Sequence, residues 1–416
     1  MKISMDALYI VGSCLTRNTS ANMSHNGYVQ GLLENGWQVD IIMAESSWGE
    51  EDKGLPIWKE ARYHAYPARS FADRLRSKGR GVFSAPIGGA GGDVSIKHSV
   101  GGFKQSMRSL AKRAFYLCFP PDKLYPLDKT WLKNAGRFRG EKPYDLVISN
   151  SSPAASHKLA GQLFRSGRIQ SHRWIQIWED PWYLDLYMKK DEAIRREEHA
   201  LLCQGDEICY VSPLTLHYQQ ELYPDCAAKM RHIPLPYLML QEETAEKRDK
   251  PLSFGYFGDY YTGTRDLRPF YQALRESGIP GYIYGDSDLQ LETTSQIQVH
   301  GRTTLDQLAK VQACVTVLVQ LCNLRGGQIP GKIYHYSATD KPILFILDGT
   351  EEEKRQLRSY FEPFERYLFC ENEIEDIRRA MELLKHQISE GQTWAPVQAF
   401  APQMVAKGLI EGQMRV

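Results

Sequence analysis

The chain of 416 residues is 42% hydrophobic and 24% charged, with a formal net charge of +1, which is the composition of an ordinary soluble protein. This length is too great for one compact core, so we expect two domains. The eight cysteines include no Cys-x-x-Cys pair, and no stretch approaches the roughly 20 apolar residues of a membrane span. These observations argue against a zinc site and a transmembrane protein, and they favour reduced thiols in a cytoplasmic protein.

Strands alternate with helices in the predicted N-terminal half. Its opening apolar run at 7–13 ends in a Gly-Ser turn, which indicates a first strand rather than a signal peptide. A polar loop at 16–26, a helix at 27–36 and a second strand at 37–44 follow. Further along the chain, the patterns predict strands at 144–152, 172–180 and 207–213 and helices at 156–167 and 215–223.

One region of this half is strongly basic. Residues 61–140 hold 16 Lys and Arg against 4 Asp and no Glu, so this region carries +12 while the rest of the chain carries −11. Residues 79–102 are rich in glycine, and we expect a flexible basic loop at about 70–105. In the segment 104–119, apolar and basic residues take separate faces at helical spacing. Such a helix either lies on an anionic membrane surface, here the inner face of the cell membrane, or packs on the core with a solvated face.

A second α/β set follows the polar stretch 241–250. Its predicted strands lie at 252–258, 281–286, 297–301, 314–321, 341–347 and 366–370, and its predicted helices at 265–278, 303–313, 331–338, 351–362 and 373–387. This alternation predicts an α/β fold of two Rossmann-like, doubly wound domains that face each other across a cleft. We place the domains at 1–238 and 250–395, and we expect a final helix in 396–416 that either crosses back to the first domain or lies on the surface.

Several common catalytic motifs are missing from the chain. It has no GxxxxGK[ST], no GxGxxG between a strand and a helix, no GxSxG and no HExxH, which disfavours P-loop NTPases and NAD dehydrogenases. Asp286 and Asp288 follow a predicted strand, and such a pair can hold a divalent metal beside a diphosphate. A turn at the end of the strand is the simpler interpretation, so we expect no metal and no cofactor.

Two loops in the C-terminal half place a cation where a helix begins. Arg265 ends the loop 258–265, and Lys332 follows the glycines and proline of GGQIPGK. A cation at a helix N-terminus is unfavourable by the helix dipole alone, so two of them make more sense if an anion such as a diphosphate lies between them. Ordinary surface cations are the alternative. The residues that we expect to bind this anion and its nucleotide include Gly258, Arg265, Gly327, Gln328, Ile329 and Lys332.

The ordered set of motifs resembles the GT-B glycosyltransferases, and among them the retaining family 4 group of bacterial polysaccharide synthesis. The resemblance rests on FPPDKLYPLDKTW, YDLVISNSSPAASHKLA, WIQIWEDPW, YFGDYYTGTRDLRPFYQAL, VHGRTTLDQLAKVQA and IPGKIYHYSATDKPIL. These motifs occur in the family's order and cover most of the chain outside 50–110. The resemblance implies a nucleotide-sugar donor, bound in the C-terminal domain, and an acceptor bound in the N-terminal domain.

The resemblance also implies roles for single residues. Arg265 and Lys332 match the two cations that hold the donor diphosphate, and Gly12 and Ser13 match the loop that approaches the donor. Asp180, in EDPW, is the N-domain acid expected at the acceptor or the transition state, with a turn-forming Asp before Pro as the alternative. His25, where the first helix is predicted to begin, can reach the acceptor or be structural.

Two positions depart from the family. It commonly has two glutamates separated by seven residues, the first near the donor sugar and the second on the nucleotide ribose. The corresponding residues here are Gly327 and His335. A neutral imidazole at His335 can still hydrogen-bond a ribose hydroxyl, whereas Gly327 offers only its backbone.

We therefore expect a hexosyltransferase-type enzyme that moves a sugar from a nucleotide-sugar to a saccharide or polyprenyl-diphosphate-linked acceptor, with retention, in surface polysaccharide synthesis. No nucleic-acid partner is expected. Two alternatives stay open: a nucleotide-sugar epimerase on the same fold, and a non-catalytic GT-B-like subunit that binds a partner glycosyltransferase. The loss of both glutamates motivates the second alternative.

Overall fold

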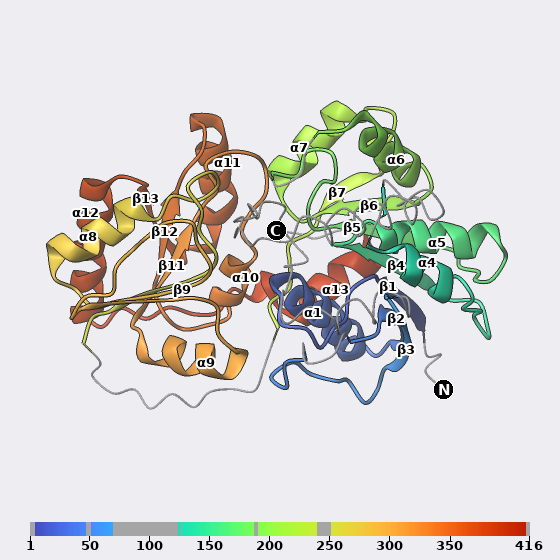
Figure 1. Cartoon of the computed structure of the whole chain (residues 1–416), viewed down its shortest axis with the longest axis horizontal. Coiled ribbons are helices and arrows are strands. Elements are labelled where there is room, and N and C mark those ends of the chain that lie inside the picture. The colour runs from blue at the N-terminus through green and yellow to red at the C-terminus, as the bar shows by residue number, and fades with distance from the viewer. Residues whose placement is uncertain are drawn as a thin grey trace, which may run out of the picture.

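The computed structural model of the chain describes residues 5–46, 51–69, 124–125, 127–186, 190–238 and 251–412. In these residues the chain forms two α/β domains that lie side by side, each built on one parallel sheet (Figure 1). The predictions of a flexible basic loop at about 70–105 and of a basic helix at 104–119 concern segments that lie outside the described residues.

The N-terminal domain is built on a seven-stranded parallel sheet of order β3-β2-β1-β4-β5-β6-β7. Its strands are β1 (Asp6–Val11), β2 (Gln38–Ala44), β3 (Arg62–Tyr66), β4 (Leu146–Ser151), β5 (Trp174–Trp178), β6 (Glu207–Tyr210) and β7 (Met230–His232). Its helices are α1 (Ser20–Glu34), α4 (Lys129–Ala135), α5 (Ala155–Arg165), α6 (Glu192–Leu202), α7 (Pro213–Leu222) and the short η1 (Ala227–Lys229). The central strands are buried on both faces, which is why their sequences are nearly continuous apolar runs.

The C-terminal domain repeats this design on a six-stranded parallel sheet of order β10-β9-β8-β11-β12-β13. Its strands are β8 (Phe254–Phe257), β9 (Gly281–Tyr284), β10 (Ile297–His300), β11 (Val317–Leu321), β12 (Ile343–Leu347) and β13 (Tyr367–Glu371). Its helices are α8 (Arg268–Ser277), α9 (Leu305–Cys314), α10 (Lys332–Tyr336), α11 (Glu351–Phe361), η2 (Glu362–Phe364) and α12 (Ile374–Ser389). Both sheets follow the doubly wound Rossmann order, so the predicted fold class is confirmed.

The main error of the predicted elements is the start of α1, which begins at Ser20 rather than near residue 27. The polar residues at this end favoured a loop, but Thr19 caps the helix by accepting a hydrogen bond from the Asn22 backbone N–H. The side chains of Asn22 and Asn26 then donate to the carbonyls of the preceding loop, among them Cys14 O at 2.8 Å and Leu15 O at 2.9 Å. These two amide groups therefore form hydrogen bonds with this loop rather than with water. The patterns also missed the strands β3 and β7, the helices α4 and α6, and the short η1.

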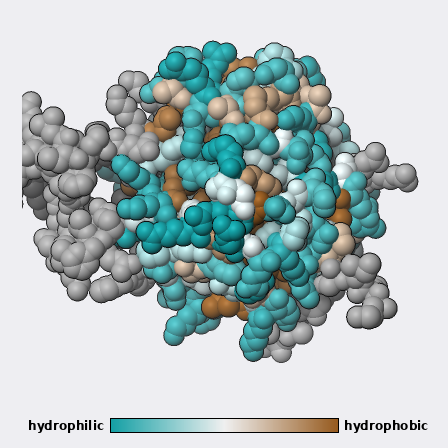
Figure 2. All heavy atoms as spheres, turned by 90° about the vertical axis from the view of Figure 1, so that its right-hand side faces the viewer, coloured by the Kyte–Doolittle hydropathy of each residue, from teal (hydrophilic) through white to brown (hydrophobic). Residues whose placement is uncertain are grey.

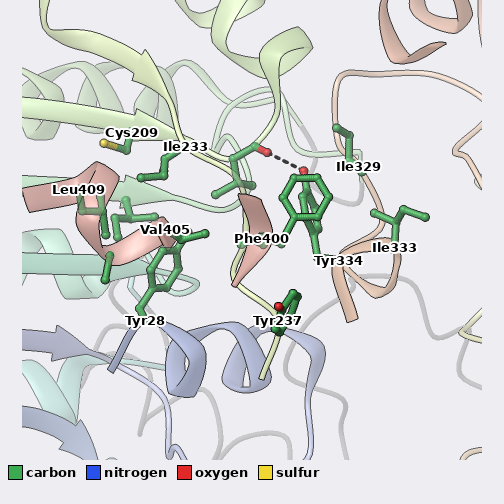
Figure 3. Packing of buried hydrophobic residues seen from close by; sticks show 14 of the residues in the cluster. Tyr28, Cys209, Ile233, Tyr237, Ile329, Ile333, Tyr334, Phe400, Val405 and Leu409 are labelled. Carbon is green, nitrogen blue, oxygen red and sulfur yellow. Dashed lines mark hydrogen bonds between the residues drawn. The ribbon is translucent and has the colours of Figure 1, made fainter. Parts of the chain in front are cut away.

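One hydrophobic cluster joins the two domains (Figure 3). Tyr28 and Ile233 belong to the N-terminal side, and Ile333 and Tyr334 belong to α10 on the C-terminal side. The Tyr334 hydroxyl donates to Val211 O at 3.2 Å, across the boundary between the domains. Burial of these side chains stabilises this arrangement of the domains, because separating them exposes the shared apolar surface to water.

The end of the chain packs against the N-terminal domain. After η3 (Gln398–Phe400), helix α13 (Pro402–Glu411) lies beside α1 (Figure 1). The two helices approach so closely at Gly31 that a Cβ there would overlap the backbone of Pro402. The last carbonyls of α13 are bound by cations of the N-terminal sheet, as when Arg173 Nη2 donates to Leu409 O at 3.0 Å.

The end face of the N-terminal domain, at the right of Figure 1, is largely hydrophilic with small scattered apolar spots over its described residues (Figure 2). In the described part of the chain, no helix has the length and apolar composition that crossing a membrane requires.

Candidate active site

The predicted donor loops lie at the carboxyl ends of the sheets, where doubly wound proteins bind ligands. Gly12 follows β1 and Gly258 follows β8, and each of these strands adjoins the point where the strand order reverses. The loop after β11 leads to Lys332, and Leu324 N donates to Thr264 O at 2.8 Å, which joins this loop to the one that carries Arg265. The tertiary structure thus brings together two cations that are far apart in the sequence.

A third cation completes this cluster. Arg302 donates from Nε to Asp259 Oδ1 at 3.1 Å and forms an ion pair with the same carboxylate. Lys332 interacts electrostatically with Asp259, Arg302 and Arg265. Arg302 and Lys332 therefore act on the Asp259 carboxylate, and Arg265 lies near enough to Lys332 to act on it. This gathering of cations favours an added anion by Coulomb attraction. Arg302 was not among the predicted site residues, although its position directly after the predicted strand at 297–301 was a usable signal.

The pKa of Lys332 is strongly perturbed. Burial lowers its pKa to about 8, with Asp259 opposing this effect and Arg302 and Arg265 adding to it. The helix it begins, α10, has only five residues rather than the eight expected, so its dipole is small. The cluster of Arg265, Lys332 and Arg302, and not the helix end, is therefore the feature that suits binding of a phosphate group.

The predicted acid Asp180 lies across the domain boundary from these cations. Gln328 Nε2 donates to Asp180 Oδ1 at 2.6 Å, and Gln328 Oε1 accepts from Leu186 N at 3.0 Å. Burial raises the pKa of Asp180, whereas the hydrogen bond from Gln328 and the charge of Arg265 act in the opposite direction. One side chain of the C-terminal domain therefore links the candidate donor loop to the candidate acid.

Gly327 is in direct contact with the N-terminal domain. Its carbonyl accepts hydrogen bonds from Thr215 Oγ1 at 3.0 Å and from Ser212 Oγ, both at the start of α7. A Cβ at Gly327 would lie 2.7 Å from Thr215 N and 3.0 Å from Leu214 C, which are backbone atoms. The close approach of α7 explains why glycine stands where the resembled family has glutamate.

A buried polar network lies under Asp180, and sequence reasoning found only part of it. Glu179, whose side chain is 8% exposed, lies 3.5 Å from His25 Nδ1, which is 3.1 Å from the Tyr9 hydroxyl. Burial, with the charge of Asp180 as a second cause, raises the pKa of Glu179 well above its ordinary value. Burial thus favours the neutral form of the Glu179 carboxyl over the ionised one. It precedes Asp180 at the carboxyl end of β5, so its position was a signal that could have identified it.

His25 lies inside α1 rather than at its start. Its side chain is completely buried, and this burial lowers its pKa to about 3, so the ring is neutral at physiological pH. Since Glu179 and Tyr9 lie next to the imidazole, an influence of His25 on an acceptor has to pass through its neighbours.

The remaining predicted residues form contacts within the protein. Gly12 N donates to Ser156 Oγ at 2.9 Å, and a Cβ there would lie 2.7 Å from Pro153 Cγ. Ser13 Oγ donates to Asn22 Oδ1 at 2.6 Å, and Ile329 is part of the shared hydrophobic cluster. His335 Nδ1 accepts from Leu238 N at 3.4 Å, in the segment that leaves the N-terminal domain. Burial and the nearby Lys332 lower the pKa of His335 to about 4, so its ring is neutral.

Comparison with known proteins places the fold among solved structures. No family model and no curated protein matches the sequence. A glycosyltransferase from Rickettsia africae aligns with a TM-score of 0.53 and 10% identity over 98% of this chain and 94% of that one. The lipopolysaccharide outer core galactosyltransferase WaaB, in its apo form, has a TM-score of 0.50 and 14% identity over 99% and 100%. The chain has the GT-B fold. A UDP-N-acetylglucosamine 2-epimerase shares it, with a TM-score of 0.53 and 8% identity over 98% and 95%.

A cavity of about 680 Å³ opens beside the domain contact of this GT-B chain. Its lining residues are Pro181, Leu184, Asp185, Leu186, Lys190, Thr215, Tyr218, Glu221, Leu222, Arg325, Gly326 and Gly327. The N-terminal domain contributes most of this wall, and the volume is in the range of small-molecule sites. The cavity adjoins Asp180 through Pro181, and the residues that line it do not include Arg265 or Lys332.

The carboxylates of the Asp286 and Asp288 pair bind protein groups. Asp286 Oδ2 lies 3.4 Å from Arg302 Nε, and Asp288 Oδ1 accepts from Thr262 N at 2.8 Å. These contacts fit the interpretation of this segment as a turn at the end of β9.

Proposed function

We propose that this protein is a glycosyltransferase that binds a nucleotide-sugar through Arg265, Lys332 and Arg302. The observation that carries the proposal is the partly buried Lys332, which interacts electrostatically with two arginines at the carboxyl edge of the C-terminal sheet. Desolvation of a lysine next to other cations is costly for the protein alone. A bound diphosphate offsets that cost, because it supplies the opposite charge. The shared GT-B fold supports this interpretation but does not by itself indicate the reaction.

In the proposed reaction, the bond between the sugar anomeric carbon and the diphosphate oxygen breaks, and a bond to an acceptor oxygen forms. The cations stabilise the negative charge that develops on the departing diphosphate. We propose retention of configuration, with the acceptor attacking from the face that the diphosphate leaves. The leaving phosphate then takes the acceptor proton, so no side-chain base is needed. Asp180 interacts electrostatically with Arg265, and Glu179 precedes Asp180 in the chain. Their carboxyl groups supply hydrogen-bonding groups to the reacting sugar or the acceptor.

The cavity between the segment that follows Asp180 and the loop 325–327 is the proposed acceptor site. Its mixture of apolar and charged residues suits a saccharide, whose rings present both C–H faces and hydroxyl groups. We further propose that the acceptor is carried on a polyprenyl diphosphate in surface polysaccharide synthesis, since residues 61–140 are strongly basic. Sedimentation with anionic liposomes tests membrane contact, and absence of binding at low salt would refute it.

The donor site is tested by calorimetric titration of the purified chain with UDP, GDP, ADP and CMP, without metal and then with magnesium. We expect one nucleotide to bind selectively. Lys332→Ala should weaken it at least 10- to 100-fold, since a hydrogen bond to a charged group contributes about 1.5–3 kcal/mol. Lys310→Ala removes the same charge from an exposed position on α9 and should leave the affinity unchanged. Equal effects of both variants would refute the site.

A non-catalytic role is the second candidate, and one observation favours it. The backbone of Gly327 and the side chain of Gln328 already bind the N-terminal domain, at the place where the resembled family has a glutamate near the donor sugar. A subunit of this kind would bind none of the four nucleotides. Product analysis with a UDP-N-acetylhexosamine alone separates a transferase from an epimerase, because only the epimerase converts this compound without an acceptor.

A further inference from the structure

Four side chains of metal-ligating type gather in the N-terminal domain, outside the candidate active site. His199 and Cys203 lie at the end of α6, four residues apart and therefore on one face of the helix. Asp225 and Cys226 lie in the loop between α7 and η1. One ligand atom of each side chain lies within 4.8 Å of all the others. Among the described residues, this is the group of His, Cys, Asp and Glu side chains that meets the spacing for a metal ion.

The distances within this group fit a tetrahedral ion better than a disulfide. Cys203 Sγ lies 3.5 Å from Cys226 Sγ and 3.6 Å from His199 Nε2. Zinc, with Zn–S of about 2.3 Å and Zn–N of about 2.0 Å, places adjacent tetrahedral ligands about 3.8 Å apart for two sulfurs and about 3.6 Å apart for nitrogen and sulfur. A disulfide would instead bring the sulfurs to about 2.05 Å. The hydrogen bond of 2.7 Å between His199 Nε2 and Asp225 Oδ2 has to lengthen to admit the ion.

Neighbouring residues hold these ligands in place. The His199 ring stacks on Tyr223, with ring centroids 5.4 Å apart and an interplanar angle of 9°. Lys229 Nζ donates to Cys203 O at 3.2 Å and to Gly205 O at 2.9 Å, which fastens the end of α6 to the segment that carries Asp225 and Cys226. Such support reduces the ordering that metal binding requires. Cys226 is buried, whereas Cys203 and Asp225 are exposed, so an ion can enter from the solvent.

We propose that His199, Cys203, Asp225 and Cys226 bind one zinc ion. Zinc suits a set of two sulfurs, one imidazole nitrogen and one carboxylate oxygen, with four protein ligands as in structural sites. The two cysteines are 23 residues apart, so a search of the sequence for a Cys-x-x-Cys pair could not find this site. The pattern His-x-x-x-Cys followed by Asp-Cys is the signal that was available.

The proposed ion connects the end of α6 to the loop before β7, next to a residue that supports the candidate active site. Glu198, on α6 beside His199, accepts hydrogen bonds from Trp182 N at 2.8 Å and Tyr183 N at 3.0 Å. These two residues follow Glu179 and Asp180 in the chain. A zinc ion at this place stabilises this part of the N-terminal domain, and this role does not depend on the reaction that the protein performs.

The test is a titration of the reduced, metal-free full-length chain with Co²⁺, followed by competition with Zn²⁺. We expect one Co²⁺ per chain, with the absorption of a tetrahedral thiolate complex, and displacement by one Zn²⁺. Cys203→Ser should weaken binding at least 100-fold. Cys314→Ser changes another exposed cysteine, at the end of α9, and should bind as the unmodified chain does.

Thermal unfolding supplies a second measurement, which does not depend on the absorption of the cobalt complex. Zn²⁺ should raise the Tm of the unmodified chain and of Cys314→Ser but not of Cys203→Ser. If Cys203→Ser does not fold, the exposed ligand variant Asp225→Asn takes its place, and weaker metal binding by it supports the site. Absence of a thiolate–cobalt band in the reduced chain would overturn the proposal. Equal loss of binding in Cys203→Ser and Cys314→Ser would also overturn it.

Discussion

The depressed pKa of Lys332 makes the proposed donor affinity depend on pH. Burial lowers this pKa to about 8, and an anion binds better when the ammonium group carries its proton. A bound diphosphate raises the pKa again because it adds negative charge beside the lysine. Affinity is therefore highest below pH 8 and falls as the pH rises through 8, until the pKa of the complex is reached.

The size of this effect follows from the fraction of protein that carries the proton. With a pKa of about 8, Lys332 is about 90% protonated at pH 7 and about 9% protonated at pH 9. The Kd of the preferred nucleoside diphosphate should thus rise about 10-fold between these pH values, which corresponds to about 1.4 kcal/mol. Binding above pH 8 should be accompanied by uptake of one proton.

Calorimetric titrations at pH 7, 8 and 9, in two buffers of different ionisation enthalpy, measure both the affinity and the proton uptake. Lys332→Arg keeps a cation that does not titrate in this range, so its affinity should vary much less with pH and reveal any titration of the ligand itself. In Asp259→Asn the carboxylate that opposes the lowered pKa is lost, and the fall in affinity should begin at lower pH. An affinity that is equally flat in the unmodified chain and in Lys332→Arg would refute the reasoning.

Two further substitutions examine the domain contact and the buried acid. Gly327→Ala places a Cβ 2.7 Å from Thr215 N, so it should lower the free energy of unfolding by about 1–3 kcal/mol and increase the radius of gyration in small-angle scattering. Gly263→Ala meets no atom within 4 Å and serves as its control; equal stability of the two variants would contradict this explanation. Glu179→Gln should leave the affinity for the nucleotide within about twofold but lower turnover at least about 100-fold, as measured once a donor is known. Turnover that survives unchanged would exclude the Glu179 carboxyl from the reaction.

Local patterns were sufficient for most of the fold. Runs such as LYIV in β1 and ILFIL in β12 are apolar because these strands are buried on both faces, and this property is visible in a short window of sequence. The elements that were missed have weaker patterns. In α6, for example, Glu198 is buried because it binds two backbone N–H groups, so a charged residue occupies a position where the pattern expects an apolar one.

The candidate site was predicted in part for the same reason. Arg265 and Lys332 stand in loops with recognisable glycines and turns, so their position at the sheet edge follows from local sequence. The third cation, Arg302, acts through its contact with Asp259, from a loop 43 residues away. A contact of this kind depends on the order of strands in the sheet, which no local pattern encodes.

The sequence alone determined the alternation of strands and helices, the two-domain α/β class and the two cation-bearing loops, since each depends on residues that are close along the chain. The tertiary structure decided which distant side chains meet. It set Gly327 against α7, His25 and Glu179 in one buried network, and Cys203 beside Cys226. These contacts arise from the packing of the two sheets and their helices, where burial of apolar surface from many elements fixes the position of each polar group.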